Sequence, residues 1–157
     1  DMCLSPLKQH YDYILIDCPP SLGMQTINAL SAADNILIPV QAQYLPAKGM
    51  TKLLNTISKV KHQINPKVDI LGVAITLANM QTNLGKSTVD TIRENYGKHI
   101  KVFNSIIPIG VKAAEASVSG KSVYQHAKDS NVAKAYEDLT KEIRKIERSK
   151  HKGTPER

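Results

Sequence analysis

Four short apolar runs, each about the length of one β-strand, alternate along this chain with segments of helical periodicity. The runs are residues 13–17, 35–40, 69–76 and 101–107. Their apolar side chains follow one another directly instead of alternating with polar ones, which is typical of strands buried beneath helices on both faces. Strands that alternate with helices predict a parallel α/β sheet, with ligands at the carboxyl ends of the strands.

Three further segments carry the three- and four-residue apolar spacing of amphipathic helices. The first is predicted to start near Pro46, which suits a first turn. Its apolar positions are Met50, Leu53, Leu54, Ile57, Val60 and Ile64. The second is predicted to begin at a capping box over Ser87–Asp90 and to stop at Gly97. The apolar stripe of the last consists of Val132, Tyr136, Leu139, Ile143 and Ile146.

Length and cysteine usage are those of an ordinary soluble protein. The 157 residues suit a single domain over 1–157, and we expect a frayed basic tail at about 150–157. No apolar run approaches the roughly 18–20 residues of a membrane span. The two cysteines, Cys3 and Cys18, lack the spacing of metal ligands and are expected to be reduced thiols in a cytoplasm.

The formal charge of +7 favours an anionic partner, most commonly nucleic acid. Aromatic residues make up only 4% of the chain, which argues against a protein that stacks single-stranded bases. Contacts with DNA would then run from lysine and arginine to phosphates, with little sequence preference. The end of the last helix is basic, with Arg144, Lys145, Arg148, Lys150, His151 and Lys152. A solvated basic surface would give the same pattern, and this alternative stays open.

The segment most specific for chemistry is Tyr11–Gly23, with the sequence YDYILIDCPPSLG. Asp17 ends its apolar run, at the place where nucleotide-binding α/β proteins hold Mg²⁺ directly or through water. The loop after Asp17 is first stiff and then mobile, as a loop that senses a γ-phosphate needs to be. The pattern alone leaves an alternative open, in which Asp17 only caps the turn that follows the strand.

Several segments resemble, in the correct order, the ParA/Soj/MinD-type partitioning ATPases, and especially the ParA-like proteins of plasmids and conjugative elements. YDYILIDCPPSLG is similar to their Walker B and switch II region. Residues 30–49, 72–84 and 106–120 resemble later parts of the family. The resemblance covers roughly residues 11–145 and implies an α/β fold of the P-loop NTPase (SIMIBI) type. The sheet would be incomplete without an N-terminal strand that carries the phosphate-binding loop.

The resemblance also implies roles for individual residues. Asp17 would be the Walker B acid, both the metal-binding and the catalytic residue, because it organises Mg²⁺ and the attacking water. Pro19, Pro20 and Gly23 would belong to switch II, and Pro108 would lie near the adenine.

The chain departs from the family pattern at three positions. Gln43 stands where many members have glutamate, whereas Gln81 and Ile109 stand where many have arginine. If those arginines contact DNA or a second subunit in other members, that contact is not available here.

Two Gly-Lys-Ser triplets, Gly85–Ser87 and Gly120–Ser122, imitate part of a phosphate-binding loop. A P-loop needs a further glycine five residues before its second one, and those positions hold Met80 and Glu115. We expect the triplets to be a helix start and a loop. Only ten residues precede Tyr11, too few for the strand, loop and helix that hold phosphates in the family. The isolated chain is therefore expected neither to bind ATP tightly nor to hydrolyse it.

The function that the resemblance implies for the intact protein is a cytoplasmic, nucleoid-associated ATPase that partitions plasmid, chromosome or mobile-element DNA. Its cofactors would be ATP and Mg²⁺, and its partners would be non-specific DNA, a ParB-like protein and a second copy in an ATP-bound homodimer. An alternative is a non-catalytic DNA-binding or dimerisation module. A membrane-bound, MinD-like protein is not expected, because the tail after Ile146 offers no apolar residue to a bilayer.

Overall fold

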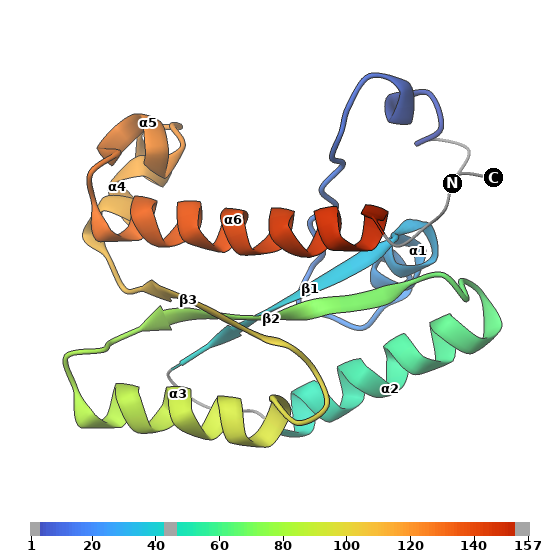
Figure 1. Cartoon of the computed structure of the whole chain (residues 1–157), viewed down its shortest axis with the longest axis horizontal. Helices are drawn as coiled ribbons and strands as arrows, with labels where there is room; N and C mark the ends of the chain where they lie inside the picture. The colour runs from blue at the N-terminus through green and yellow to red at the C-terminus, as the bar shows by residue number, and fades with distance from the viewer. Residues whose placement is uncertain (1–3, 43–46, 153–157) are drawn as a thin grey trace. The chain divides into compact units, whose positions relative to one another are not determined.

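The computed structural model describes residues 4–42 and 47–152 (Figure 1). The first elements are the 3₁₀ turn η1 (Leu7–Gln9), α1 (Met24–Ala32), β1 (Asn35–Gln41), α2 (Ala47–Gln63) and β2 (Asp69–Ala78). They are followed by α3 (Asn83–Tyr96), β3 (Val102–Pro108), α4 (Val111–Val118), α5 (Val123–Ala127) and α6 (Asn131–Lys152). Along these residues no helix is both long and apolar enough to cross a membrane.

The chain divides into two compact units, each assembled from two stretches of sequence. The first unit comprises residues 1–36 and 46–70, and the second comprises residues 37–45 and 71–157. Both β1 and β2 begin in the first unit and continue in the second. Helix α6 reaches Lys152, so residues 150–152 of the expected tail are helical, and 153–157 lie outside the described residues.

The sheet formed by the described residues has three strands in the order β1-β2-β3. Strands β2 and β3 run parallel, in a register that extends from Val73 opposite Val102 to Ala78 opposite Pro108. The predicted parallel α/β sheet is therefore confirmed. Three of the four predicted strands are present, close to their expected bounds.

The strand predicted over residues 13–17 is absent, and this prediction was wrong. These residues are described but have no regular secondary structure. A strand needs a neighbouring strand to satisfy its backbone groups, and the sheet β1-β2-β3 does not include them. Their apolar side chains consequently remain in solvent, with Leu15 93% exposed and Tyr13 55% exposed.

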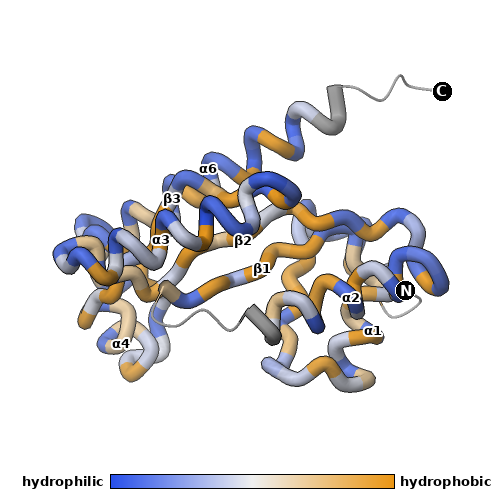
Figure 2. The backbone as a smooth tube through the Cα atoms, turned by 90° about the horizontal axis from the view of Figure 1, so that it is seen from below, coloured by the Kyte–Doolittle hydropathy of each residue, from blue (hydrophilic) through white to orange (hydrophobic). Residues whose placement is uncertain are grey.

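The core of the second unit lies between the sheet and α6. Helix α6 covers one face of this sheet, and α3 lies on the other face (Figure 1). The buried cluster consists of Leu71, Ala74, Phe103, Ile107, Val132 and Leu139. Hydrophilic and hydrophobic residues alternate along α6 (Figure 2), as expected for a helix with one buried face. The predicted stripe packs as expected at Val132, Leu139, Ile143 and Ile146, whereas Tyr136 is exposed.

In the first unit, α1 and α2 contact each other and are tied together by Asn65. The Asn65 side-chain amide donates to the carbonyl oxygens of Leu30 and Ala33, at 3.2 and 2.8 Å. These carbonyls belong to the end of α1, where helices leave such groups unpaired. Helix α2 ends before Ile64, so this residue of the predicted stripe is 53% exposed. Pro46, the expected first-turn residue, lies outside the described residues.

Helix α3 begins earlier than the sequence predicted. The N-cap is Thr82, whose hydroxyl accepts a hydrogen bond from the Gly85 amide at 3.0 Å, and not the expected box at Ser87–Asp90. Gly85 permits this turn, since a Cβ there would lie 1.9 Å from the carbonyl oxygen of Asn79. The predicted stop is confirmed, because Gly97 is the C-cap and its amide donates to Arg93.

Gly72 allows β2 and β3 to approach each other at Phe103. Its φ of 156° lies in the region that side chains rarely adopt. A Cβ at Gly72 would meet a ring carbon of Phe103 at 2.7 Å and the carbonyl oxygen of Lys101 at 2.8 Å. Phe103 is fully buried, so it has little room to move away.

We predict that Gly72→Ala destabilises the protein by about 1–3 kcal/mol through overpacking. Urea unfolding followed by circular dichroism would measure the loss. The matched control is Gly120→Ala, because Gly120 also has positive φ but nothing lies within 4 Å of the added methyl group. Equal losses in the two variants would contradict the packing argument and leave only backbone strain.

Candidate functional site

The segment that carries Asp17 leads directly into α1. Gly23 is the N-cap of α1, with an extended backbone at φ −88°. Thr26, in the first turn, is a buried polar residue, and its hydroxyl donates to the carbonyl oxygen of Ser21 at 2.6 Å. This hydrogen bond fixes the end of the predicted switch segment against the helix that follows it.

An open cavity of about 450 Å³ lies beside Asp17 within the first unit. The residues around it are Leu4, Ile16, Asp17, Cys18, Pro19, Gln25, Asn28, Ala29 and Ala32. The last four recur at three- and four-residue steps, so they share one face of α1. The cavity thus brings Asp17 and Pro19 together, whereas Pro20 and Gly23 belong to the same segment but do not line it.

The carboxylate of Asp17 is exposed, and no donor within the described residues hydrogen-bonds to it. The alternative in which Asp17 caps a turn therefore has no contact to support it. The described residues contain no group of three or more histidine, cysteine, aspartate or glutamate side chains that could hold a metal ion. A single carboxylate suits Mg²⁺, because this ion usually takes one or two carboxylates and completes its shell with water and phosphate oxygens. The side-chain oxygens of Gln25 and Asn28 are further candidate ligands.

Pro108 lies in the second unit, at the carboxyl end of β3. The next amide, that of Ile109, donates to the carbonyl oxygen of Ala78 at 3.1 Å. Gly110 is the N-cap of α4, and a Cβ there would lie 2.3 Å from a methyl group of Val132. The turn after Pro108 is therefore held against both β2 and α6.

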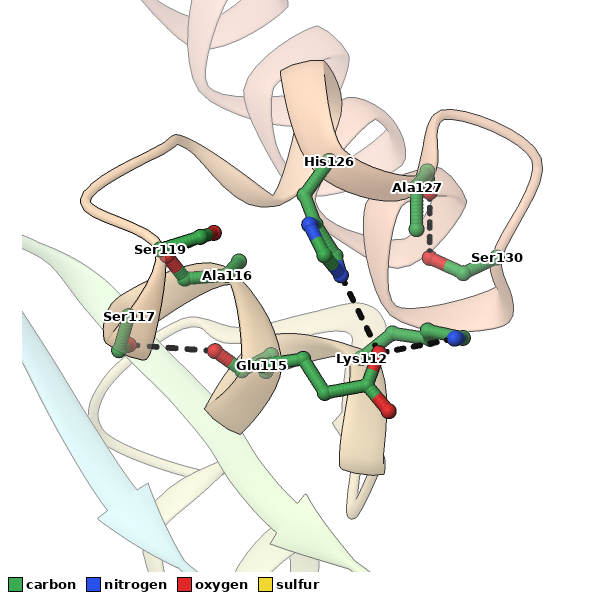
Figure 3. A network of polar contacts seen from close by, with 9 residues as sticks. Lys112, Glu115, Ala116, Ser117, Ser119, His126, Ala127 and Ser130 are labelled. Carbon is green, nitrogen blue, oxygen red and sulfur yellow. Dashed lines mark hydrogen bonds and ion pairs between the residues drawn. The ribbon is translucent and has the colours of Figure 1, made fainter.

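A polar network joins α4 and α5 beyond this turn (Figure 3). The carboxylate of Glu115 accepts hydrogen bonds from the Lys112 ammonium at 2.8 Å and from the His126 ring at 3.1 Å. The bond from Lys112, followed by that from His126, lowers the pKa of Glu115 below its usual value. These groups lie at the surface, so the network orients α5 on α4 more than it stabilises the fold.

Neither Gly-Lys-Ser triplet forms a phosphate-binding loop. Gly85–Ser87 lies in the first turns of α3, and Gly120–Ser122 connects α4 with α5. Gly120 has φ +63°, and Ser122 then caps α5 in a capping box with Gln125. The predicted helix start and loop are thereby confirmed.

Sequence reasoning missed three residues of this region, namely Thr26, Gln25 and Asn28. The signal for Gln25 and Asn28 was their helical spacing with Ala29 and Ala32, which places two amide side chains and two small side chains on one face of the helix.

Of the positions that depart from the family pattern, Gln81 and Ile109 are exposed and Gln43 lies outside the described residues.

Known proteins match this chain over most of its length. A protein-family profile described as an AAA domain matches residues 1–70. The sporulation initiation inhibitor protein Soj of Bacillus subtilis is 41% identical over 140 residues, which are 89% of this chain and 54% of that protein. The chromosome-partitioning ATPase Soj of Thermus thermophilus is 40% identical over 85% of this chain and 53% of that protein. The chromosome partitioning protein ParA of Myxococcus xanthus is 38% identical over 90% of this chain and 50% of its own length.

Solved structures of other proteins share the fold of this chain. A cobyrinic acid a,c-diamide synthase from Mycobacterium smegmatis, with a bound ATP analogue and magnesium, superimposes with a TM-score of 0.71. It is 30% identical and covers 86% of this chain and 48% of its own. The cell division ATPase MinD of Pyrococcus furiosus, 20% identical, matches with a TM-score of 0.65 over 91% of this chain and 56% of its own, and supports the fold alone.

The parallel sheet, its flanking helices and these neighbours define the fold as that of the P-loop NTPases. Within that class, the chain is similar to Soj and ParA proteins over 89–90% of its length. It spans about half the length of the curated relatives that it matches.

We predict that Thr26→Val loosens residues 19–23, because valine keeps the shape of threonine but cannot donate to Ser21. The loss of one hydrogen bond should cost about 0.5–1.5 kcal/mol. Hydrogen exchange, read by mass spectrometry over residues 19–27, should become faster. Thr140→Val is the control, since Thr140 bonds only within the exposed face of α6. Unchanged exchange over 19–27 would show that the Thr26 hydroxyl does not fix this segment.

Proposed function

We propose that this chain is the part of a ParA-like ATPase for DNA partitioning that contributes the Walker B acid and switch II. The observation that carries the proposal is the position of Asp17, which ends YDYILID, lines an open cavity and has no hydrogen-bond partner among the residues that the structure describes. Relatives named as a chromosome-partitioning ATPase and a chromosome partitioning protein, at 38–40% identity over 85–90% of the chain, support this assignment.

In the intact protein, Asp17 would hold Mg²⁺ together with waters and phosphate oxygens and would orient the attacking water. Pro19, Pro20 and Gly23 would respond to the γ-phosphate, and Pro108 would supply backbone contacts near the adenine. The M. smegmatis relative, whose structure contains an ATP analogue and magnesium, supports ATP and Mg²⁺ as cofactors. The tight turn after Pro108 is consistent with a backbone held ready for such contacts.

This chain by itself would not hydrolyse ATP. Phosphoryl transfer needs backbone amides and a lysine around the phosphates, because charge develops on their oxygens in the transition state. The two triplets that could imitate such a cradle are a helix start and a connecting loop. A single exposed carboxylate therefore offers little to a nucleotide that already carries several negative charges.

We predict that titration of Mg-ATP into the 157-residue chain gives no detectable heat in calorimetry. The variants Asp17→Ala and Asp12→Ala test any heat that does appear, since both remove one exposed carboxylate from the same segment. Binding that Asp17→Ala abolishes and Asp12→Ala preserves would contradict the expected inactivity and reveal a phosphate site in this chain. Binding that survives Asp17→Ala would contradict the role of Asp17.

Non-specific DNA is the proposed macromolecular partner, and the second half of α6 is the proposed contact. Lys141 is already paired with Glu137 and Asp138, at 3.0 and 3.3 Å. Further along the helix, the exposed side chains of Arg144, Lys145 and Arg148 have no acidic partner within the described residues. Unpaired cations along one helix can neutralise successive phosphates and release their counterions.

The same proposal includes a ParB-like partner, an ATP-dependent homodimer and a cytoplasmic location on the nucleoid. These follow from the family resemblance.

A second candidate is a non-catalytic DNA-binding or dimerisation module, which the net charge of +7 favours. The exposed Asp17 in its family sequence favours the ATPase, because a pure adaptor would have no use for it.

We predict that replacing Arg144, Lys145 and Arg148 together by glutamine weakens binding to unrelated DNA duplexes to the same degree. The slope of log affinity against log salt should become shallower by about 0.9 for each phosphate that is no longer neutralised. Fluorescence anisotropy at several salt concentrations measures both effects. The control replaces Lys52, Lys86 and Lys121 by glutamine, which removes the same charge elsewhere. If both triple variants lose affinity equally, net charge and not α6 directs the binding.

A further inference from the structure

Strand β3 contains a bulge opposite β2. Between the pairs Val73–Val102 and Ile75–Ile106, β3 advances four residues while β2 advances two. Extra residues in one strand of a pair leave backbone groups without a partner in the neighbouring strand. Here they belong to Asn104 and Ser105.

One carboxylate, that of Glu142 on α6, binds both of these free amides. The Asn104 amide donates to Oε2 at 3.0 Å, and the Ser105 amide donates to Oε1 at 2.7 Å. The Ser105 hydroxyl also donates to Oε1. Three donors therefore converge on a single side chain, which lies beside the buried stripe of α6 at Leu139 and Ile146.

The carbonyl of the same bulge is bound from the other side of the sheet. Arg93 of α3 donates through Nη2 to the carbonyl oxygen of Asn104 at 3.3 Å. Helices α3 and α6 lie on opposite faces of this sheet (Figure 1). The backbone of Asn104 is thus held at its N–H by one helix and at its C=O by the other.

The ionisation of Glu142 fits this arrangement. Burial opposes its charged form, but the hydrogen bonds from the Ser105 hydroxyl and from the Asn104 and Ser105 amides outweigh burial and lower its pKa. Lys101 adds a smaller attraction in the same direction. Since the pKa is lower in the folded state, the contribution of Glu142 to stability is complete at neutral pH and is lost as the pH falls through that value.

Strand β3 ends the order β1-β2-β3, so its outer side is an edge of the sheet described here. Unpaired backbone groups at a sheet edge can pair with a strand of another molecule. Residues 102–107 (VFNSII) carry no charge and are rich in β-branched and aromatic side chains, a composition typical of self-pairing strands. This edge would therefore be a site of association if it were open.

We propose that Glu142 closes the β3 edge, and that its carboxylate prevents pairing between the β3 strands of two copies of this chain. Backbone groups of alternate residues face the outer side of an edge strand, so a pairing strand would need an amide of this segment, and those of Asn104 and Ser105 both already have an acceptor. The carboxylate would also place a negative charge against the carbonyl groups of an incoming strand, which is unfavourable.

The direct test is amide hydrogen exchange by nuclear magnetic resonance in the 157-residue chain. Glu142→Gln retains the size of the side chain but can offer only one acceptor oxygen to the two amides. Exchange of the Asn104 or Ser105 amide should rise about tenfold or more, as expected when a hydrogen bond to a charged acceptor is removed. The Val73 amide, bonded to Lys101 between β2 and β3 at 2.8 Å, should keep its protection.

The second readout is self-association, measured by sedimentation velocity and by thioflavin fluorescence under reducing conditions. Glu142→Gln and Glu142→Ala should form larger species at concentrations where the wild-type chain does not. Glu94→Gln, which neutralises an exposed carboxylate on α3, should behave as wild type. If Glu142→Ala also loses the protection of Val73, it has lost its fold, and Glu142→Gln decides. Unchanged exchange in that variant, or faster exchange without association beyond that of Glu94→Gln, would overturn the proposal.

Discussion

The backbone groups of each strand need partners, and the arrangement of this chain follows from where those partners come from. Strand β2 lies between β1 and β3 and is the most deeply buried part of the sheet, with Val73 and Ile75 fully buried. Strand β3 has β2 on one side and, on the other, the side chains of Glu142 and Arg93. Residues 13–17 have the apolar sequence of a strand but no neighbour in this sheet, and they are not a strand. Hydrogen-bond supply, more than intrinsic preference, decides which apolar runs become strands.

The need for hydrogen-bond partners also affects the candidate functional residues. Asp17 in the first unit and Pro108 in the second are held in place in different ways. Pro108 follows a paired strand, and the turn after it is fixed by the bond between Ile109 and Ala78 and by the packing of Gly110 on Val132. Asp17 ends a segment that forms no strand, and the bond from Thr26 to Ser21 anchors the chain after it. The acid that would organise the metal therefore depends on contacts outside β1-β2-β3 for a defined position. Catalysis needs such positions to be fixed within fractions of an ångström, which a solvated segment does not provide.

Much of this fold could be predicted from the sequence. Three strands, the stop of α3 at Gly97 and most of the buried stripe of α6 follow from apolar runs, helical spacing and a glycine, which are local signals. The start of α3 was missed because Thr82 and Gly85 form a cap only where the chain turns back onto Asn79. The cavity beside Asp17 was also missed, although Gln25, Asn28, Ala29 and Ala32 were spaced to share one face of a helix. Asp17 could be predicted as a site residue, since an acid after an apolar run and a family sequence are both visible without coordinates, and its role stays a prediction.

The sequence by itself determined the fold class and the resemblance to ParA/Soj-type proteins, because the order of the segments is a property of the chain alone. Only the tertiary structure decided which runs pair, that a bulge at Asn104 and Ser105 leaves two amides free, and that Glu142 binds them from 37 and 38 residues away. The physical reason is that pairing and hydrogen-bond satisfaction depend on groups distant in sequence, whose meeting no local pattern records.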